Sequence, residues 1–506
     1  MAVVIALDAG TTGVRAFAVN EQGAPIDVEY REFTQFFPQS GWVEHDAEEI
    51  WLAIAEATRQ LIERVAQPVA AIGITNQRET VVAWDRRTGK PLHRAIVWQD
   101  RRTAARCTEL TKAGHLHRIR HTTGLVLDPY FSASKIEWLR TAGGVSLNEY
   151  VAVGTIDSWL LWNLTGGSEA NGAVHATDPS NASRTMLLDL SSQSWSPELC
   201  DLFGIPLHCL GTVQDSAGVF GTTHPDGPLP PGIPIAGIAG DQQSALFGQA
   251  CFWPGMSKNT YGTGSFVLMN VGETLPPPTE GLLTTIAWSL PRQFLESGGT
   301  GTITHFALEG SIFATGAAIQ WLRDGLEIID QASEIGPLAS SVDSSEGVVL
   351  VPAFAGLGSP YWDPYARGAI FGLSRGSSRA HIARATVDSM AFQTRDVIDA
   401  MTEVGGLNLT ELRIDGGASV MDLLMTLVAD QLQTPVVRPK HQDTTALGAA
   451  YLAGLGAGVW SSMDEVAANW EVEARVMPTA SRAAADSAYA LWQRAVDRSR
   501  AWEPQD

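Results

Sequence analysis

The sequence predicts an α/β fold built from two similar halves, and three observations support this prediction. The 506 residues are enough for two domains that each bury a sizeable core. Near the N-terminus, strand-like runs flank a helical run, in the order of sheet, crossover helix and sheet that is typical of α/β domains. A Gly/Thr turn between two apolar runs occurs at residues 3–19 and returns at residues 259–272, about half a chain later.

The composition is that of a globular protein with an acidic surface. Hydrophobic residues make up 45% of the chain, charged residues 18%, and the net charge is −21. A nucleic acid or an anionic membrane requires clustered Lys and Arg, so the charge argues against both as partners. Residues 444–463 form an uncharged run near membrane-spanning length, but Gly and Ala dominate it, and we expect a closely packed buried helix there.

The cysteines and the N-terminus indicate a cytoplasmic protein. Cys107, Cys200, Cys209 and Cys251 have neither a metal-ligand spacing nor a CxxC spacing, so we expect free buried thiols in a reducing compartment. Asp8 interrupts the first apolar run almost at once, so we expect no secretory signal.

The first Gly/Thr turn is suited to binding phosphate. Gly10 and Gly13 allow unusual backbone angles and leave room for a ligand, so several N–H groups can point at one anion. Because the same four residues, Gly-Thr-Thr-Gly, also form ordinary hairpin turns, the second interpretation stays open at this point.

Charged and hydroxyl side chains surround this turn. Thr11 and Thr12 add hydroxyl donors, Arg15 adds a positive charge, and Asp8 is placed where a carboxylate can hold hydrated Mg²⁺ beside a polyphosphate. The alternative for Asp8 is a hydrogen bond to nearby backbone. The second turn, Gly262-Thr263-Gly264-Ser265, favours a nucleotide between the two halves.

The elements after the first hairpin complete an α/β unit. Residues 26–33 read as a third strand and residues 69–74 as a fourth. Between them, Asp46 to Glu49 is a capping-box start, and the apolar residues that follow have helical spacing: Ile50, Ile54, Ala57, Leu61 and Val65.

Arg78 and Glu79 belong to residues 75–79, which come at the end of the strand of residues 69–74, where ligands of α/β sheets usually lie. Neighbouring residues of a strand point to opposite faces, so the chain must leave the sheet before both can serve one ligand. A guanidinium and a carboxylate together suit the adjacent hydroxyls of a polyol. The alternative is that each forms an ion pair with other protein residues.

Two aromatic residues are candidates for walls of the same pocket. Trp98 lies in residues 95–102, which read as a strand that runs into a polar turn, and Tyr130 belongs to the turn Asp128-Pro129-Tyr130-Phe131. Both rings can cover the carbon skeleton of a small ligand, and Tyr130 adds an O–H group. Without further context, a core position is the commoner explanation. Beyond them we expect a buried helix at residues 154–165 and a polar loop at residues 166–189.

Asp241 and Gln242 lie between a strand that ends at Gly240 and a helix that opens at residues 244–248. A carboxylate at such a joint can take a proton from a substrate hydroxyl. The alternative is an N-cap Asp, which is common in this context.

The second half begins near Pro254-Gly255, where the composition changes at what we interpret as a domain junction. We expect a flexible loop at residues 288–304 because it is rich in glycine, and a helix that holds Gly316 and Gln320. Residues 412–419 read as a strand that meets a double glycine at a helix start, a second backbone surface suited to a nucleotide.

Five motifs carry a resemblance to a known family: Asp8-x-Gly-Thr-Thr, Asn76-Gln-Arg-Glu, Gly240-Asp-Gln-Gln, Tyr261-Gly-Thr-Gly and Asp415-Gly-Gly. With them the chain resembles the FGGY family of carbohydrate kinases, and among its members those that phosphorylate glycerol. The likeness covers essentially the whole length, and in its duplicated hairpins the chain also resembles the actin and chaperone ATPase superfamily. The resemblance implies two ribonuclease-H-like domains, residues 1–252 and 253–506, with a central interlobe cleft.

The matching positions imply three sets of functional residues. The glycerol pocket would be lined by Arg78, Glu79, Trp98, Tyr130, Asp241, Gln242 and Phe266. The nucleotide would be contacted by Thr11, Thr12, Gly13, Arg15, Thr263, Gly316, Gln320, Gly417 and Met421, the last by van der Waals contact where the family has an Asn. Mg²⁺ would be held through Asp8 and Asp241.

The activity that the resemblance implies is the phosphorylation of glycerol by ATP and Mg²⁺ to sn-glycerol 3-phosphate. Asp241 would accept the proton of the terminal hydroxyl, and with an ordinary pKa of about 3.9 it would need no activation. The alternatives are a kinase for another small polyol or ketose, or a nucleotide-binding regulator without turnover. We expect glycerol and ATP as the partners, with neither nucleic acid nor an integral membrane association, and a homodimer or homotetramer.

Overall fold

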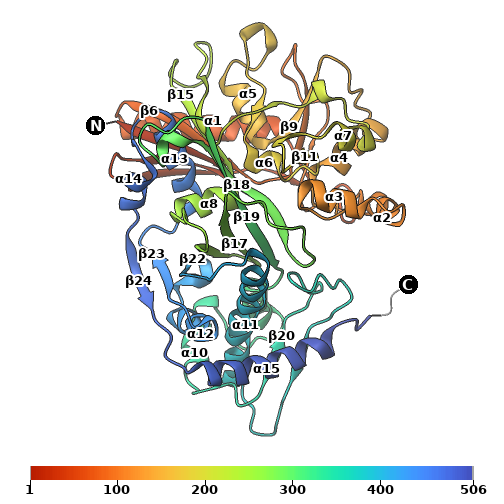
Figure 1. Cartoon of the computed structure of the whole chain (residues 1–506), viewed down its shortest axis with the longest axis vertical. Coiled ribbons are helices and arrows are strands. Elements are labelled where there is room, and N and C mark those ends of the chain that lie inside the picture. The colour runs from red at the N-terminus through yellow and green to blue at the C-terminus, as the bar shows by residue number, and fades with distance from the viewer. Residues whose placement is uncertain (1, 504–506) are drawn as a thin grey trace.

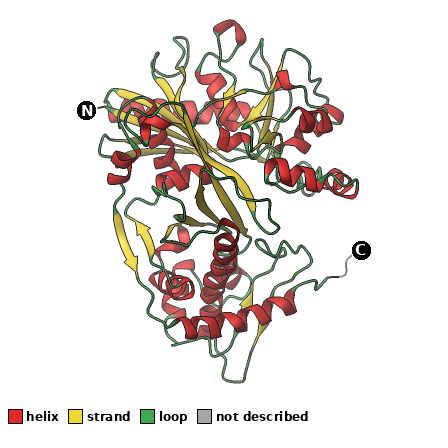
Figure 2. Cartoon of the chain, in the orientation of Figure 1, coloured by secondary structure: helices red, strands yellow, loops and turns green. Residues whose placement is uncertain are grey.

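Two large β-sheets, one above the other in Figure 1, form the cores of the two halves of the molecule. The structure is a computed structural model that describes residues 2–503. Helices lie on both sides of the sheets (Figure 2).

The first sheet has six strands in the order β14-β15-β6-β1-β2-β3. Strands β1, β2 and β3 form an antiparallel meander, and β6 and β15 run parallel to β1. The bounds are β1 Val3–Ala9, β2 Gly13–Val19, β3 Pro25–Glu32, β6 Val69–Asn76, β14 Ala217–Thr222 and β15 Pro234–Gly240.

The second sheet has seven strands in the order β18-β19-β17-β16-β22-β23-β24. Its bounds are β16 Ser257–Tyr261, β17 Ser265–Gly272, β18 Leu283–Pro291, β19 Thr302–Ile312, β22 Leu412–Gly416, β23 Val436–Pro439 and β24 Val472–Val476. Strands β16, β17 and β19 are antiparallel, and β22 and β23 run parallel to β16. The order β19-β17-β16-β22-β23 therefore repeats the order β3-β2-β1-β6-β15, which confirms the predicted duplication.

A smaller sheet and several helices complete the fold. The five-stranded sheet has the order β4-β5-β8-β7-β9, with bounds β4 Gln35–Phe36, β5 Glu44–His45, β7 Val81–Asp85, β8 Ala95–Ile96 and β9 Val151–Thr155. Short pairs are formed by β10 Ala176–Thr177 with β13 Thr212–Val213, β11 Leu188–Asp189 with β12 Ser194–Trp195, and β20 Val349–Val351 with β21 Ala369–Phe371. The helices are α1 Ala47–Val65, α2 Ala104–Lys112, α3 Leu116–Thr123, α4 Ser132–Thr141, α5 Ile156–Leu164, α6 Pro179–Ala182, α7 Pro197–Phe203, α8 Asp241–Gly248, α9 Gly316–Asp324, α10 Ile335–Ala339, α11 Arg379–Gly405, α12 Asp422–Leu432, α13 Thr444–Gly456, α14 Met463–Ala468 and α15 Arg482–Ser499.

Helix α1 is the predicted crossover between β3 and β6. The Asp46 side chain accepts hydrogen bonds from the backbone N–H groups of Glu48 and Glu49, so the predicted cap is present. Ile50, Ile54 and three further predicted apolar positions face inward, and only Val65, at the end of the helix, is not fully buried. The helix packs against β2 and β3 and so covers one face of the first sheet.

Helix α13 joins the two halves. It follows the second sheet in the chain but packs against β1, β6 and β15 of the first sheet and against α8. A Cβ atom on Gly448 would lie 1.8 Å from the Ser244 carbonyl oxygen, so α8 and α13 meet backbone to backbone. The predicted helix at residues 444–463 is buried as expected, but it ends at Gly456.

Three other boundaries differ from the prediction. Residues 288–291 and 302–304 belong to the β18–β19 hairpin and not to a flexible loop, because buried Trp288, Leu290 and Ile303 hold the two strands in the sheet and core. The glycines that suggested a loop are confined to the turn. Gly154 and Thr155 end β9 instead of opening a helix. Residues 95–102 run from a strand into a turn, as predicted, but only Ala95–Ile96 is strand.

All four cysteines are buried free thiols, as predicted. Burial raises the pKa of Cys107 to about 11, which keeps this thiol protonated. Among residues 2–503, no helix combines the length and the apolar character that crossing a bilayer requires.

Candidate active site

The centre of the site is the turn after β6. The strand ends at Asn76, and Glu79 adopts a left-handed backbone conformation with φ of +62°. The chain therefore leaves the sheet where the sequence required it, and both Arg78 and Glu79 point into one buried cluster. Each of these two side chains is only 2% exposed.

Arg78 is held by acceptors from several elements. Its Nη1 lies 2.6 Å from Glu309 Oε2 and its Nη2 donates to the Tyr130 hydroxyl at 3.3 Å. Its Nε lies 3.1 Å from Asp241 Oδ1, on the first turn of α8. The guanidinium thus connects the predicted polyol residues Tyr130 and Asp241.

Two partners of this cluster, Arg184 and Glu309, were missed by the sequence analysis. Arg184 Nε lies 2.7 Å from Glu79 Oε1, and its Nη2 lies 2.9 Å from Glu309 Oε1. Both side chains are completely buried. Glu309 lies on β19 of the second sheet, whereas Arg78, Glu79 and Arg184 come from the first half, so the network links the halves. The ion-pair alternative for Arg78 and Glu79 is therefore realised, within the candidate site itself.

The charge of Glu309 is fixed by its neighbours. Burial alone would raise the pKa of this carboxyl, but the guanidinium groups of Arg184 and Arg78 outweigh burial and lower it to about 2. Glu309 is the only carboxylate in residues 303–312, a run rich in apolar residues, and this was a signal that it serves a buried partner.

Trp98 and Tyr130 stand together beside the cluster. Their ring centroids are 5.5 Å apart in an edge-to-face arrangement, and Trp98 Nε1 donates to Thr11 Oγ1 at 3.0 Å. This bond connects the aromatic wall to the first hairpin. The turn that carries Tyr130 is fixed by Lys135, whose buried ammonium donates to three consecutive carbonyls, those of Pro129, Tyr130 and Phe131.

Asp241 is the first residue of α8, so the helix begins three residues earlier than predicted. The N-cap position belongs to Gly240, and Asp241 Oδ1 accepts from the neighbouring Gln242 N–H at 2.7 Å. The N-cap alternative for Asp241 is therefore wrong. Its side chain is 34% exposed, unlike that of Arg78. Burial raises its pKa to about 6, so the expectation of an ordinary pKa is also wrong, although the group stays ionised at neutral pH.

Phe266 lies on the side of the second sheet that faces this cluster. It is two residues from Leu268 on β17, and Leu268 is paired with Glu309 on β19. Because alternate residues of a strand share a face, Phe266 and Glu309 are on the same side of the sheet.

A second region is a cavity of about 780 Å³ in the second half, a volume that suits a small-molecule ligand such as a nucleotide. Its lining includes all five predicted nucleotide residues of this half: Thr263, Gly316, Gln320, Gly417 and Met421. A Cβ atom on Gly316 would lie 2.5 Å from the Gly262 carbonyl oxygen, so only glycine fits where α9 meets the hairpin tip.

The first hairpin does not line this cavity but is connected to it. Arg15 Nη2 lies 2.5 Å from Asp8 Oδ2 and its Nη1 lies 2.9 Å from Asp443 Oδ1. The next residue, Thr444, donates to Asp415, which comes two residues before Gly417 of the cavity. Thr11, Thr12 and Gly13 form the tip beside Asp8 and Arg15, where Gly10 N–H donates to Gly13 O at 3.0 Å.

Asp8 and Asp241, the candidate Mg²⁺ residues, each have one carboxylate oxygen that forms no hydrogen bond or ion pair with the described residues. In residues 2–503, no three His, Cys, Asp or Glu side chains lie together as a ready metal site. Arg15 engages Oδ2 of Asp8, and the contacts of Asp241 with Arg78 and Gln242 use Oδ1. Each carboxylate keeps one oxygen, which fits a Mg²⁺ ion whose other ligands are water or phosphate.

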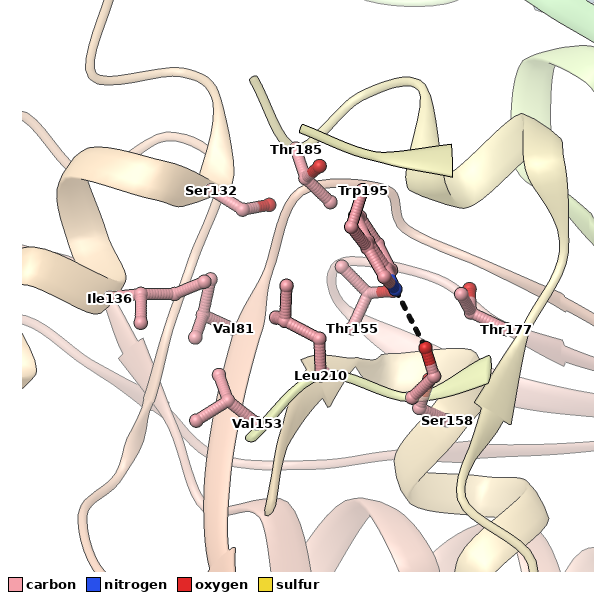
Figure 3. A pocket seen from close by; sticks show the side chains of 12 residues that line it. Val81, Ser132, Ile136, Val153, Thr155, Ser158, Thr177, Thr185, Trp195 and Leu210 are labelled. Carbon is pink, nitrogen blue, oxygen red and sulfur yellow. Dashed lines mark hydrogen bonds between the residues drawn. The ribbon is translucent and has the colours of Figure 1, made fainter. Parts of the chain in front are cut away.

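A smaller cavity, drawn in Figure 3, is not a substrate site. Its volume of about 20 Å³ is room for a single water molecule. Val81, Ile136, Val153 and Leu210 point into it, and the described residues that line it carry no charge.

Two domain models of one known protein family match the chain. The N-terminal domain model of the FGGY family of carbohydrate kinases matches residues 3–248, and the C-terminal domain model matches residues 257–457. Glycerol kinase from Bordetella parapertussis is 50% identical, with 99% of this chain and 97% of the relative covered. Glycerol kinase 2 from Thermotoga maritima is also 50% identical, with 99% and 100% covered.

Solved structures show the same fold. Plasmodium falciparum glycerol kinase with ADP superposes with a TM-score of 0.91 at 34% identity, covering 99% of this chain and 98% of that one. A ligand-bound xylulose kinase from Lactobacillus acidophilus gives a TM-score of 0.85 at 19% identity, covering 98% of each chain, and so supports the fold alone. With both family domains matched over most of its length, the chain belongs to the FGGY family of carbohydrate kinases.

Proposed function

We propose that this chain phosphorylates glycerol with ATP to give sn-glycerol 3-phosphate. Relatives named glycerol kinase, about 50% identical over 99% of the chain, support this choice of substrate within the family. The observation that carries the proposal is the contact between Arg78 and Asp241. A fully buried guanidinium holds a partly exposed carboxylate by one oxygen, and the other oxygen remains available for a substrate proton.

The proton is proposed to move from the terminal hydroxyl of glycerol to Asp241. Phosphoryl transfer passes through a loose transition state, so the protein contributes mainly position and charge. As the hydroxyl oxygen bonds to the γ-phosphorus, the bond from that phosphorus to the β,γ-bridging oxygen breaks, and ADP leaves. The hydroxyl proton goes to Asp241, whose pKa of about 6 makes it a stronger base than an ordinary Asp.

The remaining hydroxyls are proposed to bind at Arg78, Glu79 and Tyr130. Arg78 already donates to Glu309, Gln243 and Tyr130, and its Nε faces Asp241, so its donors are engaged within the protein. The contact with the Tyr130 hydroxyl is the longest of these at 3.3 Å. We expect a glycerol hydroxyl to replace it, while Trp98 and Phe266 cover the carbon atoms.

ATP is proposed to occupy the 780 Å³ cavity, with its phosphates toward the two Gly/Thr hairpins. Thr11, Thr12, Gly13 and Arg15 of the first hairpin and Thr263 of the second supply donors, because backbone N–H groups and cations favour phosphate. Mg²⁺ held by Asp8 would neutralise charge on the phosphates. The free oxygen of Asp241 is assigned to the substrate proton, so Asp241 would contribute to the Mg²⁺ site through its negative charge. We also propose that residues 1–252 and 253–506 are the two domains, and that the enzyme is a cytoplasmic homodimer or homotetramer.

The test is ADP release from ATP and Mg²⁺ over a panel of polyols and ketoses. The proposal predicts that glycerol gives the highest kcat/KM. A higher kcat/KM for another polyol or a ketose would instead support the first alternative, and nucleotide binding without turnover on any substrate would support a regulator. Light scattering of the same preparation tests the oligomeric state.

A further inference from the structure

Lys258 is a completely buried cation between the two parts of the site. It lies on β16, which runs into the hairpin tip that lines the 780 Å³ cavity. Its Nζ donates to the side-chain oxygen of Gln242 on α8 and, at 2.9 Å, to Thr260 Oγ1. Neither partner carries a charge. Within the described part of the chain, no carboxylate oxygen lies within 4.0 Å of Nζ.

A buried ammonium without a carboxylate partner is costly, so its position needs an explanation. The charged groups that face Lys258 from the surrounding elements are Asp415 on β22, Asp241 on α8, Glu309 on β19 and Arg78. Burial lowers its pKa to about 8, and the three carboxylates act in the opposite direction. Lys258 therefore remains protonated at neutral pH.

The ammonium determines how Gln242 is oriented. A lysine ammonium has three donors and no acceptor, so Gln242 must present its Oε1 atom to Lys258. Its NH₂ group then points away from Lys258. Because the backbone N–H of Gln242 donates to Asp241 Oδ1, the residue is fixed beside this carboxylate from both its backbone and its side chain.

We propose that Lys258 is a positioning residue that holds the Gln242 amide with its NH₂ group toward the substrate. The site then offers a donor, Gln242, next to an acceptor, Asp241, and a hydroxyl group of a polyol satisfies both. This inference rests on the proposed function, because the oxygen that accepts the hydrogen bond from the Gln242 NH₂ group is taken to be a hydroxyl of glycerol. Nothing in the sequence pattern alone distinguishes Lys258 from a surface lysine of a strand.

The experiment is a double-mutant cycle in glycerol affinity. Lys258→Met and Gln242→Ala are each expected to raise the KM for glycerol about 10-fold, with a smaller effect on kcat, because each removes one oriented hydrogen bond. The double variant is expected to match Gln242→Ala alone within about 2-fold, because Lys258 acts through Gln242. Effects that multiply would overturn the proposal, since a general structural role would act independently of Gln242.

A second variant tests, with Lys258 intact, whether Gln242 presents its NH₂ group or its oxygen to the substrate. Gln242→Glu keeps an oxygen for Lys258 but has no NH₂ group, so its KM for glycerol should rise as much as in Gln242→Ala. Unchanged affinity would mean that Gln242 presents oxygen to the substrate, and the proposal would be wrong. Gln242→Glu also tests the orientation of the Gln242 amide if Lys258→Met fails to fold.

Lys440→Met is the matched control, because Lys440 is an exposed lysine paired with Glu471, and its KM should be unchanged. Calorimetric titration of each variant with glycerol gives the same comparison without turnover. A wild-type protein that binds glycerol but does not phosphorylate it would refute the proposed function, and the titrations would still decide the role of Lys258.

Discussion

The two sides of the site are built differently. The polyol side is a buried network in which Arg78, Glu79, Arg184 and Glu309 form ion pairs with one another across the two halves. The nucleotide side is a cavity of about 780 Å³ formed largely by glycines, apolar side chains and the start of α9. A small polyol has few atoms with which to be recognised, so its side needs fixed charges. A nucleotide is large enough to be held by backbone groups and surface area.

The largest effect is expected on kcat, from a change at the proposed base of the polyol side. Asp241→Asn removes the proton acceptor and keeps the shape of the side chain, so kcat should fall roughly 10²- to 10⁴-fold. The affinity for glycerol, measured by calorimetry, should change little. Near-normal turnover of this variant would show that Asp241 is not the base.

The next largest effect is expected in stability. Glu309→Gln leaves the buried guanidinium groups of Arg78 and Arg184 without their shared carboxylate, which should cost about 3–5 kcal/mol in the free energy of unfolding. Urea denaturation measures it. The control is Glu273→Gln, which removes an exposed partner of Arg292 and should cost less than about 1 kcal/mol. Equal effects of both variants would contradict a special role for the network.

The polyol side and the nucleotide side should differ in how they depend on pH. Asp241 must be deprotonated to accept a proton, so kcat/KM should fall as the pH drops through about 6, the pKa that burial gives this group. The binding of ADP, followed by calorimetry, should not show this transition. A loss of kcat/KM that begins only near pH 4 would mean that Asp241 titrates as an ordinary carboxyl.

The smallest effect is expected on the nucleotide side. Met421 lines the cavity beside Gly336 on α10, where an added Cβ atom would lie 3.3 Å from Met421 Cγ. Met421→Ala therefore removes apolar area without removing a charge. The KM for ATP should rise about 5-fold and the KM for glycerol should stay the same. An equal rise in both constants would show that the two sides are not independent.

Local patterns in the sequence were enough to predict the elements and most of the candidate residues. The two hairpins, helix α1 and the turn at Arg78 and Glu79 follow from apolar periodicity, caps and glycines, which act over a few residues. Arg184 could not be paired with Glu309 in this way, because 125 residues separate them and their contact exists only after the halves meet. Lys258 was missed for another reason: its partners Gln242 and Thr260 are close in sequence, but its local pattern does not differ from that of a surface lysine on a strand.

Two errors have a common physical origin. The glycines of residues 298–301 suggested a flexible loop, yet the strands on either side are held in the sheet by buried side chains such as Trp288. The ordinary pKa expected for Asp241 likewise ignored burial, which raises it to about 6. Tertiary packing overrode a local tendency in both places.

The most direct measurement is a crystal structure of the protein with glycerol. A terminal hydroxyl within hydrogen-bonding distance of Asp241, with the remaining hydroxyls at Arg78 and Glu79 and the carbon atoms against Trp98, is the predicted result. Glycerol bound away from Asp241, or an Asp241 side chain turned from the ligand, would contradict the account.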